Sequence, residues 1–179
     1  MTNDTFNKDE ENRDKQIISN AAWWKGRRGE WYVIVQVIFF GLVLFGPQTV
    51  EGFPAWRFPY SHLASGVGAV CLLIGCLLAV SGVFRLGTNL TAVPYPKEQA
   101  TLVETGTYRL VRHPIYSGLI FMGFGWALWV HGWLTIVYAI ILFVFFDIKS
   151  RREEQWLKEK FPDYAAYQKR VNKLIPFIY

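Results

Sequence analysis

Three apolar blocks that contain no charged residue constrain the fold of this chain more than any other feature. They cover residues 31–47, 62–84 and 115–146, and none of them holds an Asp, Glu, Lys or Arg. The hydrocarbon core of a bilayer is about 30 Å thick, so a helix needs roughly 20 apolar residues to cross it. The first two blocks therefore predict one membrane-spanning helix each, whereas the third is too long for a single span.

A break near the middle of the third block predicts a helical hairpin. His131, Gly132 and Trp133 interrupt the apolar run there, and Trp129 and Trp133 are typical of a membrane interface. Backbone polar groups in lipid must be paired within a helix or a closed barrel, and no block shows the period of two of a barrel strand. We therefore expect an all-α polytopic membrane protein with four transmembrane helices, or five if the polar N-terminal arm adds a short one. The expected spans are about 31–47, 62–84, 114–130 and 133–148.

Small residues in the second block predict close packing between helices. Gly68 and Gly75 are separated by two helical turns and therefore share one face. Glycines in such positions let transmembrane helices approach each other closely. Cys71 and Cys76 have neither the spacing of a CxxC motif nor that of a metal-binding pair, so we interpret them as packing residues.

The distribution of Lys and Arg predicts the orientation in the membrane. Counted along the chain, the segments outside the four expected spans hold six, one, four, none and eight of these residues. Because cytoplasmic flanks are enriched in positive charge, this alternation predicts that both termini are cytoplasmic. The first 30 residues are polar and lack the apolar core of a signal peptide. We attribute the formal net charge of +5 to this enrichment of positive charge at the cytoplasmic side and to contact with anionic membrane lipids. We expect no binding of nucleic acid.

Composition divides the chain into two parts. Residues 1–22 are polar and mixed in charge, which predicts a disordered N-terminal arm, and residues 23–179 are expected to form a single membrane domain. Trp23 and Trp24, with the basic residues after them, are expected to anchor the first span at the interface. The sequence carries no signal that decides the oligomeric state.

The two outer ends of the hairpin carry the ionisable residues that could support chemistry. Pro114 predicts the start of the third span, since proline is favoured at the first position of a helix, and Arg112 and His113 precede it directly. No Gly or Pro ends the fourth helix at the membrane boundary, so it should continue beyond the bilayer through Glu154. A short hairpin brings its outer ends together, and we expect the cation and the imidazole to meet the carboxylates of the fourth helix.

These side chains also have ordinary structural interpretations. His113 could cap a helix at the interface, and Glu153 and Glu154 could form a solvated helix face. Tyr108 and Tyr116 fit either an aromatic belt or contacts with a planar or cationic cofactor. From residue types alone, both interpretations stay open.

Several other classes of site are excluded. The chain has no GxGxxG after a predicted strand and no GxxxxGK[ST], which argues against a soluble dinucleotide-binding or P-loop enzyme. No spacing of Cys, His, Asp or Glu is typical of a zinc site, so we expect no metal. His62 and His131 fall at the opposite membrane face under the predicted topology, and we interpret both as structural.

One set of residues in the C-terminal half of the chain carries a resemblance to a known family. It consists of Gly106, Tyr108, Arg112, His113, Pro114, Tyr116 and Gly118, then Glu153, Glu154 and Leu157, and finally Phe161, Pro162, Tyr164, Tyr167 and Pro176. In this pattern the chain resembles the isoprenylcysteine carboxyl methyltransferase family, which is related to the membrane phospholipid methyltransferases. The combination of RHPxYxG with a distant pair of glutamates is specific, and the match covers roughly residues 85–179.

The resemblance implies an integral membrane methyltransferase that uses S-adenosylmethionine. Its acceptor would be a lipophilic small molecule or a lipid-modified substrate at the cytoplasmic interface, and its cofactor region would comprise residues 85–118 and 147–179. Either Lys149 or Arg112 would orient an anionic acceptor. Carried over by position, the cofactor-binding residues would be Ala100, Thr101, Leu102, Val103, Tyr108, His113, Pro114, Ile115, Tyr116, Glu153 and Glu154.

The chain departs from the family pattern at a position that bears on the acceptor. Relatives that methylate a prenylcysteine carboxylate have an arginine one turn before the first glutamate of the pair, and this chain has Lys149 there. The positive charge is kept, but a lysine cannot make the bidentate contact that an arginine makes with a carboxylate. Pro162 also stands near a position where relatives often have glycine. The acceptor therefore stays open among prenylated or other thioether carboxylates, phospholipid amines and small lipophilic thiols.

Two other functions compete with this interpretation. One is an NADPH-dependent membrane reductase of sterol-reductase-like architecture, which would bind a nicotinamide cofactor instead of S-adenosylmethionine. The other is a non-catalytic membrane scaffold, in which changes at His113 or Glu153 would alter stability but no activity.

Overall fold

The described part of the chain is built from helices. The computed structural model describes residues 29–52 and 60–179, and within them the only β pairing is an isolated bridge between Val111 and Asn172. The helices are α2 (Glu30–Phe45), α3 (Tyr60–Leu86), α4 (Pro114–Trp129), α5 (Trp133–Lys160) and α6 (Tyr164–Arg170), with short 3-10 turns η2 (Gly87–Asn89) and η3 (Gly106–Arg109). The prediction of an all-α fold is therefore confirmed for these residues. The N-terminal arm, its tryptophans and the fifth span that the arm could add lie outside the described residues.

Two of the helices are long and apolar enough to cross a membrane. The helical run Tyr60–Asn89 has 30 residues and contains an 18-residue stretch with a mean hydropathy of 2.5, and Trp133–Lys160 has 28 residues and contains an 18-residue stretch with a value of 1.8. The other two apolar helices, α2 and α4, have 16 residues each. At 1.5 Å per residue such a helix is about 24 Å long, somewhat shorter than the hydrocarbon core of a typical bilayer.

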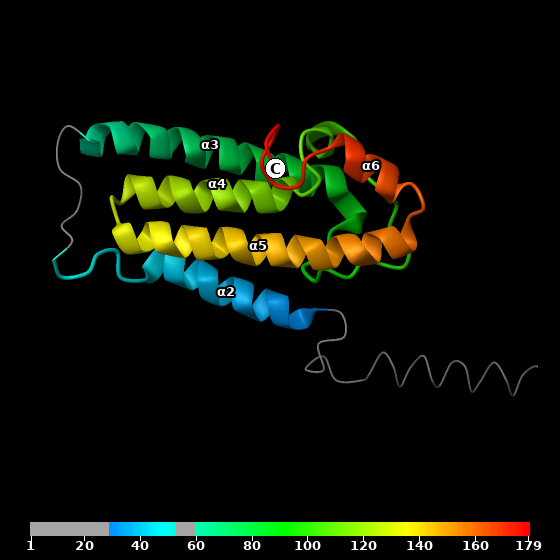
Figure 1. Ribbon diagram of the computed structural model, residues 1–179, viewed down its shortest axis with the longest axis horizontal. Helices are drawn as coiled ribbons and strands as arrows, with labels where there is room; N and C mark the ends of the chain where they lie inside the picture. Colours follow the sequence, from blue (N-terminus) through cyan, green and yellow to red (C-terminus); the bar gives the residue numbers. More distant parts are fainter. Residues whose placement is uncertain (1–28, 53–59) are drawn as a thin grey trace, which may run out of the picture.

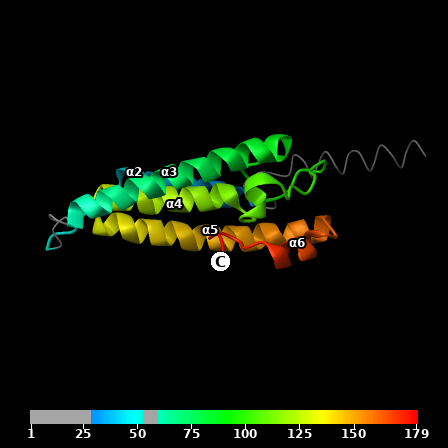
Figure 2. The same cartoon turned by 90° about the horizontal axis from the view of Figure 1, so that it is seen from above.

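The four long helices lie side by side in the order α3, α4, α5, α2, and α6 lies beside the far end of α5 (Figure 1). The second view shows α3 running along α4 over most of its length (Figure 2). Aromatic rings join α2 to α5, where the ring centroids of Phe39 and Phe145 are 5.3 Å apart and those of Phe40 and Phe146 are 6.2 Å apart. The buried apolar core of the bundle lies between α2, α4 and α5.

Glycines form the contact between α3 and α4, as the spacing in the second block predicts. A Cβ atom added at Gly68 would lie 2.8 Å from the carbonyl oxygen of Gly125, and one added at Gly75 would lie 2.6 Å from that of Gly118. Both distances are far shorter than a van der Waals contact, so the two backbones touch directly. This glycine contact positions the start of α4 against α3. The functional site lies at that end of α4.

The turn between α4 and α5 is tied to the start of α3. His131, which has a φ of 55°, places its Nε2 atom 3.0 Å from Ser65 Oγ and 2.9 Å from the carbonyl oxygen of Ser61. These contacts agree with a structural role for this histidine. It lies at the turn of the hairpin that α4 and α5 form, away from the hairpin's feet, which are the start of α4 and the outer part of α5. At the other end α5 continues to Lys160, so the predicted extension through Glu154 is confirmed.

The C-terminal segment folds back along α5, as Figure 2 shows. Leu174 is completely buried, and the ring of Tyr179 lies 6.4 Å from that of Phe143 on α5. Phe177 and Ile178, in contrast, are exposed. The expected packing of this apolar segment on the domain is therefore carried by Leu174 and Tyr179.

Candidate functional site

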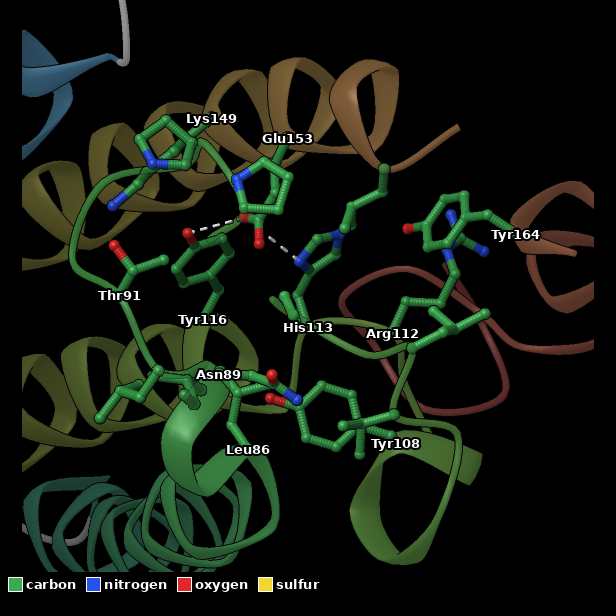
Figure 3. Close-up of a pocket in the computed structure, with 18 of the residues that line it drawn as sticks. Leu86, Asn89, Thr91, Tyr108, Arg112, His113, Tyr116, Lys149, Glu153 and Tyr164 are labelled. Carbon is green, nitrogen blue, oxygen red and sulfur yellow. Dashed lines mark hydrogen bonds and ion pairs between the residues drawn. The ribbon is translucent and has the colours of Figure 1, made fainter. Parts of the chain in front are cut away.

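A cavity of about 320 Å³ lies at the end of the bundle where the two feet of the hairpin meet. Its wall is formed by α2, the end of α3, the loop that follows, the start of α4, the outer part of α5, and α6. Figure 3 shows side chains from the end of α3, the loop that follows, the start of α4, α5 and α6 around this cavity, although these elements are far apart in the sequence. Ligand pockets typically have volumes of roughly 300–1,000 Å³, so the cavity can hold a small organic molecule.

The predicted site residues converge here. Those that line the cavity are Ala100, Thr101, Leu102, Val103, Tyr108, Arg112, His113, Ile115, Tyr116, Lys149 and Glu153. Pro114 and Glu154 do not line it. Pro114 is buried against α3, where it would contact any side chain placed at Gly82. The carboxylate of Glu154 instead contacts Arg112, His113 and Gln168.

His113, Tyr116 and Glu153 form the central cluster. His113 precedes the first residue of α4 and Tyr116 follows one turn later, so their rings stack with centroids 5.4 Å apart and planes 5° from parallel. The Tyr116 hydroxyl donates a hydrogen bond of 2.8 Å to Glu153 Oε2, and His113 Nδ1 lies 3.7 Å from the same oxygen. The cluster presents one carboxylate and two aromatic faces, an arrangement that suits a cationic ligand.

Glu154 joins the two feet of the hairpin to the C-terminal segment. Its Oε1 atom accepts a hydrogen bond of 2.7 Å from Arg112 Nε and lies 3.2 Å from His113 Nε2, and its Oε2 atom accepts one of 2.7 Å from Gln168 Nε2. Arg112 Nη1 also donates to the carbonyl oxygens of Gln168, at 3.1 Å, and Val171. Both charged side chains are buried, so Arg112 is largely committed to holding the structure together.

Lys149 occupies the other end of the cavity wall. It is only 2% exposed, and its ammonium group donates hydrogen bonds to Gln36 Oε1 at 2.7 Å and to the carbonyl oxygen of Ala92 at 3.3 Å. The same group lies 5.1 Å from the centroid of the Tyr116 ring. Lys149 and Glu153 therefore face the same side of α5, as their spacing predicts, with Tyr116 between them (Figure 3).

The loop between α3 and α4 closes the cavity and is fixed by its own polar contacts. Asn89 and Thr101 are joined by reciprocal hydrogen bonds of 3.2 Å between the Asn89 side chain and the Thr101 backbone. Lys160, at the end of α5, donates to the carbonyl oxygen of Glu98 at 2.8 Å. These contacts hold the 100–103 segment against the cavity.

Three tyrosines around the cavity remain neutral at physiological pH. Burial is the main cause that raises the pKa of Tyr108, Tyr164 and Tyr167 above the ordinary value. The Tyr167 hydroxyl donates a hydrogen bond of 2.6 Å to the carbonyl oxygen of Tyr108. The Tyr164 hydroxyl is buried and has no hydrogen-bond partner among the described residues, yet its side chain lines the cavity. An unpaired buried hydroxyl costs roughly 1–3 kcal/mol, so this group is a candidate ligand contact.

Sequence reasoning missed several residues of the wall. They include Gln36 on α2, Leu86 and Asn89 at the end of α3, Thr91 and Ala92 in the loop, Leu119 on α4, and Tyr164 and Tyr167 on α6. Gln36 could have been singled out, because it is the one amide side chain in the apolar block 31–47. Tyr164 and Tyr167 belong to the recognised pattern but had no role assigned.

Comparison with known proteins agrees with the site. The chain matches the phospholipid methyltransferase family over residues 63–164. It is 32% identical over 118 residues to a probable protein-S-isoprenylcysteine O-methyltransferase of Oryza sativa subsp. indica, an alignment that covers 64% of this chain and 62% of the rice protein. It is also 32% identical over 120 residues to protein-S-isoprenylcysteine O-methyltransferase of Saccharomyces cerevisiae, covering 61% of this chain and 50% of the yeast protein.

A solved structure that resembles this chain is also an isoprenylcysteine methyltransferase. The structure of the eukaryotic intramembrane Ras methyltransferase, an isoprenylcysteine carboxyl methyltransferase, matches with a TM-score of 0.60 and 25% identity, and the match covers 82% of this chain and 51% of that chain. The chain thus spans less than two thirds of the length of these relatives. The resemblance found in the sequence is confirmed, and the chain belongs to the phospholipid methyltransferase family.

Proposed function

We propose that this chain is an S-adenosylmethionine-dependent integral membrane methyltransferase that modifies a lipophilic acceptor at the cytoplasmic membrane interface. The observation that carries the proposal is the cavity at the feet of the hairpin, where His113, Tyr116 and Glu153 meet. The family match and the isoprenylcysteine methyltransferases among its relatives support the reaction class.

The residues present fit the proposed cofactor. S-adenosylmethionine carries a sulfonium cation, an ammonium group and an adenosine portion. The Glu153 carboxylate and the stacked rings of His113 and Tyr116 supply the negative charge and the π faces that these cations favour. The Tyr164 hydroxyl, which has no hydrogen-bond partner in the described part of the chain, and the 100–103 segment offer further polar and apolar contacts on the same cavity. These residues would hold the cofactor in one orientation.

Methyl transfer depends more on the alignment of the methyl donor and the acceptor than on acid or base catalysis. When bound, S-adenosylmethionine supplies a methyl group, whose bond to the acceptor forms as its C–S bond breaks and the bonding pair stays on sulfur. The protein's task is to hold the two partners in line at near-contact distance, which can account for several kcal/mol of the barrier. The buried walls of the cavity also exclude water from the reacting atoms.

Of the two cations proposed to orient an acceptor, Lys149 is the better placed. Arg112 is engaged by Glu154 and by carbonyl oxygens of the C-terminal segment. Lys149 projects into the cavity beside α2, and α2 presents exposed apolar side chains such as Val37 and Ile38 that suit contact with lipid. An acceptor with an apolar tail would enter from the bilayer at this side.

We further propose that α2, α3, α4 and α5 all cross the membrane and that both termini are cytoplasmic. The alternation of Lys and Arg supports this topology, as do the two long apolar helices. Residues 23–179 would then be one methyltransferase domain, with its cofactor region, 85–118 and 147–179, on the cytosolic side. The shorter helices α2 and α4 would be accommodated by local thinning of the bilayer.

The proposal is tested on the full chain reconstituted in lipid nanodiscs. Calorimetry should show binding of S-adenosylmethionine, and His113→Ala and Glu153→Gln should each weaken it about tenfold or more, the loss expected for a hydrogen bond to a charged group. Glu159→Gln is the matched control, because Glu159 is an exposed glutamate on the same helix.

Membranes that contain the chain and a radiolabelled methyl donor should also transfer label to extractable lipid or lipid-modified material. Binding of NADPH without binding of S-adenosylmethionine would instead favour a reductase. Variants that lower thermal stability while the wild-type chain binds neither cofactor would favour a scaffold.

A further inference from the structure

An open groove of about 500 Å³, separate from the cavity at the hairpin's feet, lies between α5, α6 and the C-terminal segment. Figure 2 shows α6 and that segment on the same side of α5. Among the described residues that line the groove, Glu154 carries the one acidic side chain, and it is buried against Arg112. The basic side chains of the lining are Arg112, Arg151, Lys169, Arg170 and Lys173.

The groove keeps a surplus of positive charge after its ion pairs are counted. The pairs are Arg112 with Glu154, Arg151 and Lys173 with Asp147, and Arg170 with Glu104. Three carboxylates therefore face five cations, which leaves two positive charges among the side chains that the structure describes. Lys169 is exposed, and the side chains of Arg151 and Arg170 are each 65% exposed, so the surplus charge lies at the open side of the groove.

An exposed apolar face of α5 leads up to this groove. Val137, Ile140, Val144 and Ile148 recur every three or four residues, so they share one face of the helix, and each is about half exposed. Arg151 follows three residues after Ile148 and continues this face into the groove. Because the charge-free block of α5 ends at residue 146, the apolar face suits acyl chains and Arg151 suits the level of the lipid head groups.

The C-terminal turn adds apolar side chains at the same place. The backbone N–H groups of Ile178 and Tyr179 both donate to the carbonyl oxygen of Ile175, at 3.1 and 3.0 Å, and close the turn. Phe177 has a φ of 64°, which is uncommon for a bulky residue, and its side chain is 84% exposed. Ile178 is also exposed and lines the groove. Exposed apolar and cationic side chains in one place suit the boundary between acyl chains and head groups.

We propose that this groove binds an anionic phospholipid of the surrounding bilayer. Arg151, Lys169 and Arg170 would contact the phosphate of its head group, and the exposed face of α5 would contact its acyl chains. Guanidinium groups bind phosphate well because their N–H donors match its oxygens in pairs. A free phosphate ion has no acyl chains to place on α5. The inference rests on the proposed membrane topology and not on methyl transfer, since this lipid is bound and not modified.

A lipid in the groove would stabilise the segment that holds the start of α4. The backbone N–H groups of Arg112 and His113 donate to the carbonyl oxygens of Asn172 and Lys173, at 2.9 and 3.2 Å. Asn172 and Lys173 also line the groove, so a ligand there contacts the segment that carries these carbonyl oxygens. A ligand that binds only the folded state raises its stability by mass action. The proposal therefore predicts that an anionic lipid raises the thermal midpoint of the protein.

The test compares the full chain in nanodiscs of phosphatidylcholine with the full chain in nanodiscs of an equimolar mixture of phosphatidylcholine and phosphatidylglycerol. The mixture should raise the thermal midpoint of the wild type by about 4 °C or more. The double variant Arg151→Gln, Lys169→Gln should lose most of this rise. Each variant is compared with itself in the two lipids, so a loss of stability common to both lipids does not affect the result.

A matched control separates a defined site from general attraction between a basic protein and an anionic membrane. The double variant Arg109→Gln, Lys158→Gln removes the same two charges from exposed positions that do not line the groove, and it should keep the rise. An equal loss in the two double variants would overturn the proposal. Inorganic phosphate added to the phosphatidylcholine nanodiscs should not reproduce the rise, and if it does, the groove takes a free anion and the lipid site is refuted.

Another occupant of the groove would give a different result. Residues 1–28 lie outside the described residues and contain five acidic side chains. If they or another partner cover the groove, the wild type should show the same midpoint in both kinds of nanodisc, which also overturns the proposal. Binding of S-adenosylmethionine is measured separately. A chain that binds no cofactor but shows the lipid effect would refute the proposed function and leave the lipid site standing.

Discussion

Replacing Gly75 by alanine should force α3 and α4 apart and thereby damage the site. The added methyl group would lie 2.6 Å from the carbonyl oxygen of Gly118 and 2.8 Å from the backbone nitrogen of Met122. An ordinary contact begins at 3.4 Å, so the helices would have to separate by about 0.8 Å. Because backbone atoms of α4 oppose the methyl group, no side chain can rotate away to make room. Overpacking of this kind costs about 1–3 kcal/mol.

The expected result is a thermal midpoint several degrees lower and a weaker site. For a chain of this size, about 1 kcal/mol shifts the midpoint by roughly 2–4 °C. The shift of α4 also displaces Tyr116, which lies half a turn before Gly118, and a misplacement near 1 Å can reduce a reaction rate by as much as about a hundredfold.

Unfolding of the detergent-solubilised chain and binding of S-adenosylmethionine are the two measurements. Gly66→Ala is the matched control on the same helix, because its added methyl group would meet nothing within 4 Å. Equal midpoints for the two variants would refute the direct backbone contact.

Three further predictions concern the polar groups around the cavity. Glu154→Gln leaves the buried Arg112 without its counter-charge, so thermal unfolding should show a loss of about 3 kcal/mol or more; an unchanged midpoint would contradict a buried ion pair. Tyr164→Phe removes a hydroxyl that has no partner within residues 29–52 and 60–179, so stability should stay the same or rise slightly while calorimetry shows weaker binding of S-adenosylmethionine; unchanged affinity would exclude the hydroxyl as a cofactor contact. Burial raises the pKa of Tyr108, Tyr164 and Tyr167, so the unfolded chain loses these protons first, and stability that is present below about pH 10 should fall as the pH rises further. Phenolate absorbance should then appear together with unfolding, and its appearance in the folded chain would contradict this account.

Features that depend on neighbouring residues could be predicted from the sequence. The absence of charge over whole blocks indicated apolar helices, and Pro114 marked the first residue of α4 because its ring suits only the start of a helix. The hairpin is short, so its feet had to meet, and the contacts of His113 with Glu153 and Glu154 confirm that they do. The glycine spacing predicted a close contact but not its partner helix.

Features that depend on long-range packing could not be predicted. The charge pattern suggested similar roles for Arg112 and Lys149, but the structure gives Arg112 a hydrogen bond to a carboxylate and gives Lys149 hydrogen bonds to neutral oxygens. The difference depends on how α6 and the C-terminal segment lie beside Arg112 and on how α2 lies beside Lys149.

The sequence by itself therefore determined the helices, the meeting of the hairpin's feet and the family, because block length, proline position and motif spacing are properties of the chain alone. Only the tertiary structure decided which charges are compensated. Whether a buried ion has a partner depends on which distant elements pack against it, and in this protein that packing separates a structural arginine from a lysine that faces the cavity.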